Sequence, residues 1–132
     1  MNQYNLHQEW FDKAEEDELS IGAIFSANGA PSTVCFLSQQ MAEKYLKGFL
    51  VFHQIEFPKI HQLEKLLQMC KNIDSLFSEL NEESVLLSEF YIETRYPGDY
   101  PQFSWSDAKT AHIAAVKIKE FIINKIKNKN VS

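Results

Sequence analysis

One segment, from Pro31 to about His53, is apolar on nearly every side of the helix that its residue spacing predicts. A helix with apolar side chains around most of its axis is normally surrounded by other helices, because each side must be shielded from water. The long polar side chains of this segment are confined to its middle. The segment therefore predicts the central helix of an all-α fold. Its apolar residues are Val34, Phe36, Leu37, Met41, Ala42, Tyr45, Leu46, Phe49, Leu50 and Phe52.

Helical spacing of apolar residues predicts further helices over residues 5–27, 61–71, 82–94 and 105–127. The 132 residues have the size of one domain, and four glycines and four prolines are too few for the turns of a β-sandwich. We expect a single domain over residues 1–132, an up-and-down bundle of about five helices with a frayed basic tail. The apolar residues of the first helix are Trp10, Phe11, Ala14, Leu19, Ile21, Ala23 and Ile24.

Several residues predict where helices begin and end. Asparagine and glycine tolerate the left-handed backbone that ends a helix, proline suits a first turn, and short polar side chains cap the first turn. A serine followed three residues later by an acid resembles a capping box. The expected signals are Asn28 and Gly29 as a stop, Pro31 in a first turn, Asp74 capping a single turn, Asn81 capping the next helix, and Ser104 with Asp107 as a capping box.

The formal net charge is −5, from 13 basic and 18 acidic residues, so the protein as a whole is not expected to bind polyanions. Six acids lie between Glu9 and Glu18, and five lysines lie between Lys117 and Lys129. Twelve of the basic residues are lysine, and Arg95 is the single arginine. Any site that needs a guanidinium must therefore use Arg95.

Cys35 and Cys70 lie in apolar helical contexts without a paired-cysteine motif, which favours two buried free thiols. The N-terminus has no basic stretch followed by an apolar one, as a secretory signal would. The longest apolar run, Phe49–Phe52, is far shorter than the roughly 20 residues of a membrane span. These features predict a cytoplasmic protein.

The chain has none of the common catalytic or phosphate-binding motifs. Its histidines, His7, His53, His61 and His112, are scattered without the spacing of a metal site. The glycine-rich phosphate loops and the nucleophile elbow are also absent from the sequence. We expect neither a metal nor a required cofactor.

Gln40, Glu43, Lys44 and Lys47 fall along one face of the central helix over two turns. One interpretation is an exposed stripe, with Glu43 and Lys47 as an i, i+4 salt bridge. The other is a groove shared with another helix or a second subunit, in which the two lysines attract a phosphate. The spacing leaves both interpretations open.

A second candidate is the loop Arg95-Tyr96-Pro97-Gly98-Asp99-Tyr100, followed by Phe103 and Trp105. An arginine beside an aromatic turn can hold a phosphate while a ring stacks on a base. Alternatively, the aromatic side chains close the end of the bundle, and Arg95 pairs with a nearby acid. Both interpretations again remain open.

Four stretches, in order along the chain, resemble motifs of the HEPN family. The central helix carries the most specific of them, and in the first helix Glu18 separates an acid and a leucine that usually adjoin in the family. The resemblance spans residues 10–125. The stretches are Ala14 with Asp17 and Leu19, residues 36–50 with Gln40, Glu43, Lys44 and Lys47, residues 61–67 beginning at His61, and Thr94-Arg95-Tyr96-Pro97.

The resemblance implies an all-α fold that usually forms a homodimer. Some HEPN proteins bind nucleotides, and others act with a separately encoded minimal nucleotidyltransferase, including as toxin–antitoxin pairs. A large group are metal-independent ribonucleases that use an R-x(4–6)-H motif. Because Arg95 is the single arginine, the histidine of that motif would have to be residue 100, 101 or 102, which are Tyr, Pro and Gln. We therefore expect no ribonuclease activity from this motif.

The resemblance and the residues together predict a non-catalytic homodimeric module that holds a nucleotide or an RNA phosphate in a groove. Two alternatives remain: a partner subunit of a nucleotidyltransferase, and a divergent ribonuclease in which His61 replaces the missing histidine. In the preferred hypothesis, Lys44, Lys47, His61 and Arg95 contact the anion, Tyr96 or Tyr100 stacks on a base, and Gln40 and Glu43 orient the lysines or hydrogen-bond across the dimer.

Overall fold

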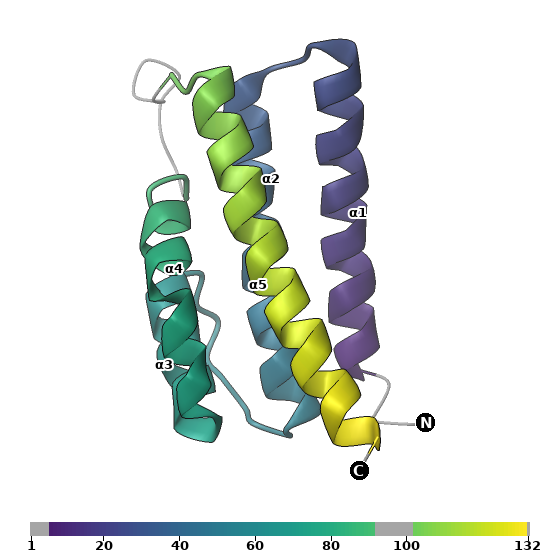
Figure 1. The fold of residues 1–132 in the computed structure, drawn as a ribbon, viewed down its shortest axis with the longest axis vertical. Coiled ribbons are helices and arrows are strands. Elements are labelled where there is room, and N and C mark those ends of the chain that lie inside the picture. Colours follow the sequence, from purple (N-terminus) through teal and green to yellow (C-terminus); the bar gives the residue numbers. More distant parts are fainter. Residues whose placement is uncertain (1–5, 92–101, 132) are drawn as a thin grey trace.

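The structure is a computed structural model that describes residues 6–91 and 102–131, with side chains described as far as residue 128. Within these ranges the fold is all-α, as predicted (Figure 1). Its elements are α1 (Leu6–Ala27), α2 (Pro31–Phe52), α3 (Leu63–Ile73), the 3-10 helix η2 (Ser75–Leu80), α4 (Asn81–Ser88) and α5 (Trp105–Val131).

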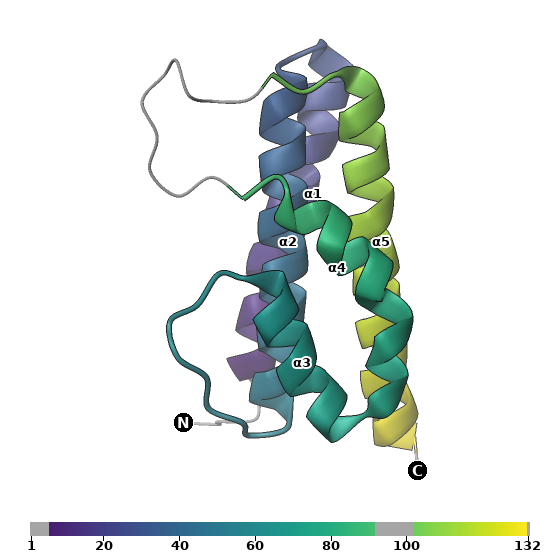
Figure 2. The same cartoon turned by 90° about the vertical axis from the view of Figure 1, so that its left-hand side faces the viewer.

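Helix α2 lies at the centre of the bundle, as its sequence predicts. It packs against α1, α3, α4 and α5, and Figures 1 and 2 show α1 on one side of it and the pair α3 and α4 on the other. Most of its residues from Val34 to Leu50 are buried, including Glu43 and Lys47. Gln39, Glu43 and Lys47 are thus inside the bundle, whereas Gln40 and Lys44 are partly buried, so the polar side chains of α2 do not form an exposed stripe.

The contact between α1 and α2 is close at Gly48. A Cβ atom at this position would lie 2.4 Å from Cε1 of Phe11, so only glycine leaves room for the ring. The Phe11 ring in turn stacks on Tyr45, with 5.3 Å between ring centroids. Along α1 the buried residues are Phe11, Ala14 and Ile21, whereas Leu19 is 72% exposed. The prediction for Leu19 was wrong, because its spacing fits a helix but its direction points away from α2.

Several predicted helix boundaries are confirmed. Asn28 has a φ of 54°, the left-handed backbone that ends α1. The side chain of Asp74 accepts a hydrogen bond from the backbone N–H of Leu76 at the start of η2. Ser104 and Asp107 form a reciprocal capping box, in which each backbone N–H donates to the other side chain at 3.0 and 3.1 Å.

Two predictions at helix α4 need correction. Asn81 does not cap it, because η2 runs directly into α4 and leaves no free helix start; Asn81 itself has helical dihedrals. Helix α4 ends at Ser88, whereas the predicted helix extended to residue 94. Residues 92–94 of that prediction lie outside the described part of the chain. Its last turn tightens into i to i−3 hydrogen bonds, and Phe90 is buried against Phe103 at 4.7 Å between ring centroids.

Both cysteines are free and buried, as predicted. Burial raises the pKa of Cys35 to about 11, with a further contribution from the negative charge of Asp107, and burial also raises the pKa of Cys70. Each thiol therefore stays protonated at neutral pH and is a poor nucleophile. No helix in the described ranges combines the length and apolar character that crossing a membrane requires.

Candidate functional site

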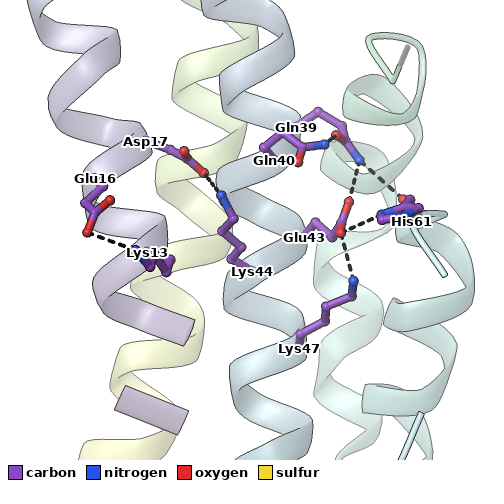
Figure 3. A network of polar contacts seen from close by, with 9 residues as sticks. All are labelled: Lys13, Glu16, Asp17, Gln39, Gln40, Glu43, Lys44, Lys47 and His61. Carbon is purple, nitrogen blue, oxygen red and sulfur yellow. Dashed lines mark hydrogen bonds and ion pairs between the residues drawn. The ribbon is translucent and has the colours of Figure 1, made fainter. Parts of the chain in front are cut away.

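The polar side chains of α2 divide between two neighbours (Figure 3). Lys44 reaches toward α1, where its Nζ donates to Oδ2 of Asp17 at 2.6 Å. Lys47 and Glu43 instead lie on the side of His61, which precedes α3. The two lysines that were expected to share one groove therefore have separate carboxylate partners.

Glu43 is the centre of the network. Its side chain is 5% exposed, and its Oε2 accepts a hydrogen bond from Nζ of Lys47 at 2.8 Å and lies 2.9 Å from Nδ1 of His61. Its Oε1 accepts a longer hydrogen bond, 3.4 Å, from Nε2 of Gln39. A carboxylate in so dry a position requires both a counter-charge and hydrogen-bond donors, and this arrangement supplies both.

Lys47 is itself almost completely buried, with 7% of its side chain exposed. Its ammonium lies 5.5 Å from the centroid of the Trp10 ring and 5.8 Å from that of Phe57. Such ring faces attract a cation, so the aromatic pair adds to the attraction of Glu43. Lys47 thus joins α1, α2 and the connection that leads to His61.

Gln39 and Gln40 extend the network toward the same connection. Nε2 of Gln40 donates to Oε1 of Gln39 at 2.7 Å, and Nε2 of Gln39 donates to the backbone carbonyl of His61 at 3.3 Å. Gln39 is fully buried. The backbone of His61 is therefore held by Gln39, while its ring is held by Glu43.

The His61 ring has one buried edge and one exposed edge. Nδ1 lies against Glu43, and 49% of the side chain remains exposed. Its Nε2 has no hydrogen-bond partner among the residues that the structure describes. One face of the ring stacks on Tyr91, with a centroid distance of 5.6 Å and an angle of 15° between the planes.

A pocket of about 200 Å³ opens beside this ring pair. It includes the start of α3, where Gln62 is the N-cap residue and forms no side-chain cap. The first N–H groups of a helix carry partial positive charge and are a favourable place for an anion. The pocket is lined by Gln39, His61, Gln62, Leu63, Glu64, Lys65, Ser88 and Tyr91.

Four of the predicted site residues, Gln40, Glu43, Lys47 and His61, belong to one connected network. Lys44 lies apart, on the side of α1. The remaining three predicted residues, Arg95, Tyr96 and Tyr100, lie outside the described residues.

Among the residues that line the pocket, sequence reasoning predicted only His61, and those that it missed include Gln39, Lys65 and Tyr91. Gln39 carried a signal, since a long polar residue sits next to Gln40 in the most apolar helix. Lys65 also carried a signal, since it lies four residues after His61 in the same segment. Tyr91 carried none, because only the packing of α3 against α4 brings it to His61.

Phe103 and Trp105, which follow residues 92–101 in the sequence, pack within the bundle. Phe103 meets Phe90 edge to face, and the Trp105 ring lies 5.5 Å from that of Phe25. For these two rings the interpretation that they close the end of the bundle is confirmed. In the described part of the chain, no group of three histidine, cysteine or acidic side chains is placed to hold a metal ion.

Comparisons with known proteins place this geometry in context. A family model described as HEPN domain matches residues 7–129. The solved structure of ST0689, an archaeal HEPN homologue, superposes with a TM-score of 0.72 at 26% sequence identity, covering 91% of this chain and 97% of that chain. A comparison with curated proteins gives no match.

Proposed function

Because the chain belongs to the HEPN domain family, we propose that it is a non-catalytic binding module that holds a nucleotide or an RNA phosphate in the pocket beside His61. The observation that carries this proposal is the way in which Glu43 holds the His61 ring beside the pocket. A buried carboxylate fixes Nδ1, while the opposite edge of the ring stays exposed at the pocket. A ring held in this way loses little further freedom when it binds a ligand.

The phosphate would lie at the start of α3. In its protonated form the His61 ring offers an N–H donor at Nε2, Lys65 supplies a positive charge, and the first turn of α3 supplies backbone donors. The stacked rings of His61 and Tyr91 offer an aromatic surface for a base. Arg95, four residues after Tyr91 in the sequence, is proposed as a further phosphate contact, with Tyr96 or Tyr100 as a second stacking ring.

The lysines of α2 contribute indirectly in this proposal. Lys47 supplies the counter-charge to the buried Glu43 carboxylate that holds His61. Lys44 ties α2 to α1 through Asp17. We further propose that the protein works as a homodimer, as the family relation suggests.

Isothermal titration calorimetry with AMP, ATP, GTP and a short 5′-phosphorylated RNA tests the proposed binding. We expect heat of binding from the wild-type protein, and a loss of affinity of about tenfold for H61A and for K65A, because each removes one contact to a charged group. The matched control is K127A, a lysine exposed at the end of α5, which should bind as the wild type does.

Two results would contradict the proposal. Absence of heat with every nucleotide and with the RNA would eliminate the binding role and leave a role in protein interaction, such as that of a nucleotidyltransferase partner. Cleavage of the RNA by purified protein in the presence of EDTA, lost in H61A, would show that the module is a divergent ribonuclease.

A further inference from the structure

The pocket beside His61 is small for a nucleotide. Its volume is about 200 Å³, whereas pockets that enclose a whole small-molecule ligand usually measure about 300–1,000 Å³. It has room for one phosphate group and part of a base, so the rest of a larger nucleotide would lie outside it, over the surrounding surface. The charges at the mouth of the pocket therefore decide which nucleotides are bound.

Few groups at the pocket can balance the charge of a phosphate. Among the described residues that line it, Lys65 supplies the one permanent positive charge, and His61 is the other side chain that can become cationic. Nδ1 of His61 is held by Glu43, so the Nε2 edge of the ring alone remains for a ligand. Together with the backbone N–H groups at the start of α3, these two side chains match the oxygens of one phosphate group.

Glu64 places a negative charge in the same wall of the pocket. It lines the pocket and lies in the first turn of α3, between Leu63 and Lys65. Its side chain is exposed and forms no ion pair with any residue that the structure describes. A carboxylate in the first turn already takes up part of the positive potential at the start of the helix. Further phosphate groups at this place would meet repulsion without compensation.

The lysines of α2 add no surplus positive charge to the pocket (Figure 3). Lys47 forms an ion pair with Glu43 at 2.8 Å, so the buried pair is neutral as a unit. Lys44 pairs with Asp17 on the side of α1. Neither lysine lines the pocket. The network that holds His61 therefore fixes the ring without attracting a highly charged ligand.

The sequence that follows Tyr91 adds no surplus positive charge either. Residues 92–101, which lie outside the described part of the chain, include one basic residue, Arg95, and two acidic residues, Glu93 and Asp99. Proteins that bind triphosphates commonly surround them with the backbone N–H groups of a glycine-rich loop, a lysine and a magnesium ion, and this sequence has no such loop. The positive charge available thus matches one phosphate group rather than three.

We propose that the pocket selects a ligand with a single phosphate group beside a base, and that Glu64 sets this selection by repelling further phosphates. The ligand is a nucleoside monophosphate or the 5′-monophosphate end of an RNA, which share this chemistry. The selection presupposes the phosphate binding proposed above. A phosphate monoester carries a charge of about −1.5 to −2 at neutral pH, and a triphosphate adds two more ionised groups, which a repulsive carboxylate rejects.

Isothermal titration calorimetry with AMP, ADP and ATP measures the selection. The titrations are done at one ionic strength and in EDTA, because magnesium would neutralise part of the triphosphate charge. We expect the wild-type protein to bind ATP about tenfold more weakly than AMP, with ADP between them. In E64Q the difference should shrink to about threefold or less, chiefly through tighter binding of ATP.

The matched control is E9Q. Glu9 is likewise an exposed acid in the first turn of a helix, but it lies on α1, on the other side of α2 from α3 (Figure 1). E9Q removes the same formal charge and should leave the preference for AMP over ATP unchanged.

Two short RNAs of one sequence, with a 5′-monophosphate and a 5′-hydroxyl end, distinguish the two sources of the ligand. Tighter binding of the phosphorylated RNA than of AMP would support the RNA end, and binding of AMP without binding of either RNA would support the free mononucleotide. Equal binding of the two RNAs would overturn the proposal, because internal phosphodiesters would then be the groups recognised.

The remaining outcomes separate the selection from the phosphate binding on which it depends. No heat with any of these ligands would overturn both. Binding of ATP as tight as that of AMP would overturn the selection alone and leave the pocket as a phosphate site. A preference for AMP that E64Q leaves unchanged would overturn the assignment to Glu64.

Discussion

Glu43 determines the chemistry of the candidate site although it lies beneath it. Its carboxylate has two charged or ionisable neighbours, Lys47 and His61, and an amide donor from Gln39. Replacing any one partner changes the electrostatic balance of a group that water scarcely reaches. The function of His61 is thus coupled to the stability of the helix behind it.

Substitution of Glu43 by glutamine should expose this coupling. The E43Q variant keeps the shape of the side chain but removes its negative charge. The Lys47 ammonium is then buried without a counter-ion. We expect the free energy of unfolding to fall by about 3 kcal/mol, measured by urea denaturation. The double variant E43L/K47M, which removes both charges, should recover most of that loss.

The exposed pair Lys13 and Glu16 provides the control for this measurement. Their side chains are 67% and 65% exposed, and Nζ of Lys13 lies 3.6 Å from Oε2 of Glu16. E16Q should therefore change the free energy of unfolding by less than about 0.5 kcal/mol. An E43Q variant as stable as E16Q would mean that the network contributes nothing to the fold and does not fix His61.

At the scale of helices, the glycines of α1 and α2 have opposite roles. Gly48 faces Phe11 across the contact of the two helices, whereas a Cβ atom at Gly22 would meet no atom within 4 Å. Both residues are inside helices, where glycine lowers stability relative to alanine unless the space is needed. The two positions therefore separate helix propensity from packing.

Alanine at the two positions should change stability in opposite directions. G22A should raise the free energy of unfolding by about 0.5–1 kcal/mol, because it reduces the freedom of the unfolded chain. G48A should lower it by about 1–3 kcal/mol, because the new methyl group displaces the Phe11 ring. Thermal and urea unfolding measure the stability of both variants. A G48A variant more stable than the wild type would contradict the prediction, because it would show that α1 moves to accommodate the methyl group without loss of stability.

Periodicity predicted the helices because the spacing of apolar residues within one segment indicates both the helix and the face that it buries. The apolar pattern placed α2 at the centre, and the i, i+4 spacing of Glu43 and Lys47 predicted their ion pair. Tertiary packing decided the rest: Asp17 is 27 residues from Lys44 and His61 is 18 residues from Glu43. Spacing within one helix carries no information about such partners.

At the scale of the whole molecule, the central helix α2 and the ion pairs of α5 hold the bundle together. The pocket lies where α2, the start of α3 and the end of α4 meet. Ion pairs from α5 connect the bundle, since Lys119 binds Glu18 of α1 at 2.7 Å and Lys125 binds Asp74 at 2.8 Å. A substitution of an exposed pocket residue is therefore expected to leave the bundle folded.

The central claim, that the pocket beside His61 holds a phosphate, is tested most directly by amide chemical shifts of ¹⁵N-labelled protein titrated with AMP. The account predicts saturable shifts concentrated at residues 61–65 and at Ser88 and Tyr91, which in H61A need about tenfold more AMP to saturate. Saturable shifts confined to other surfaces, or no shifts at any AMP concentration, would contradict it.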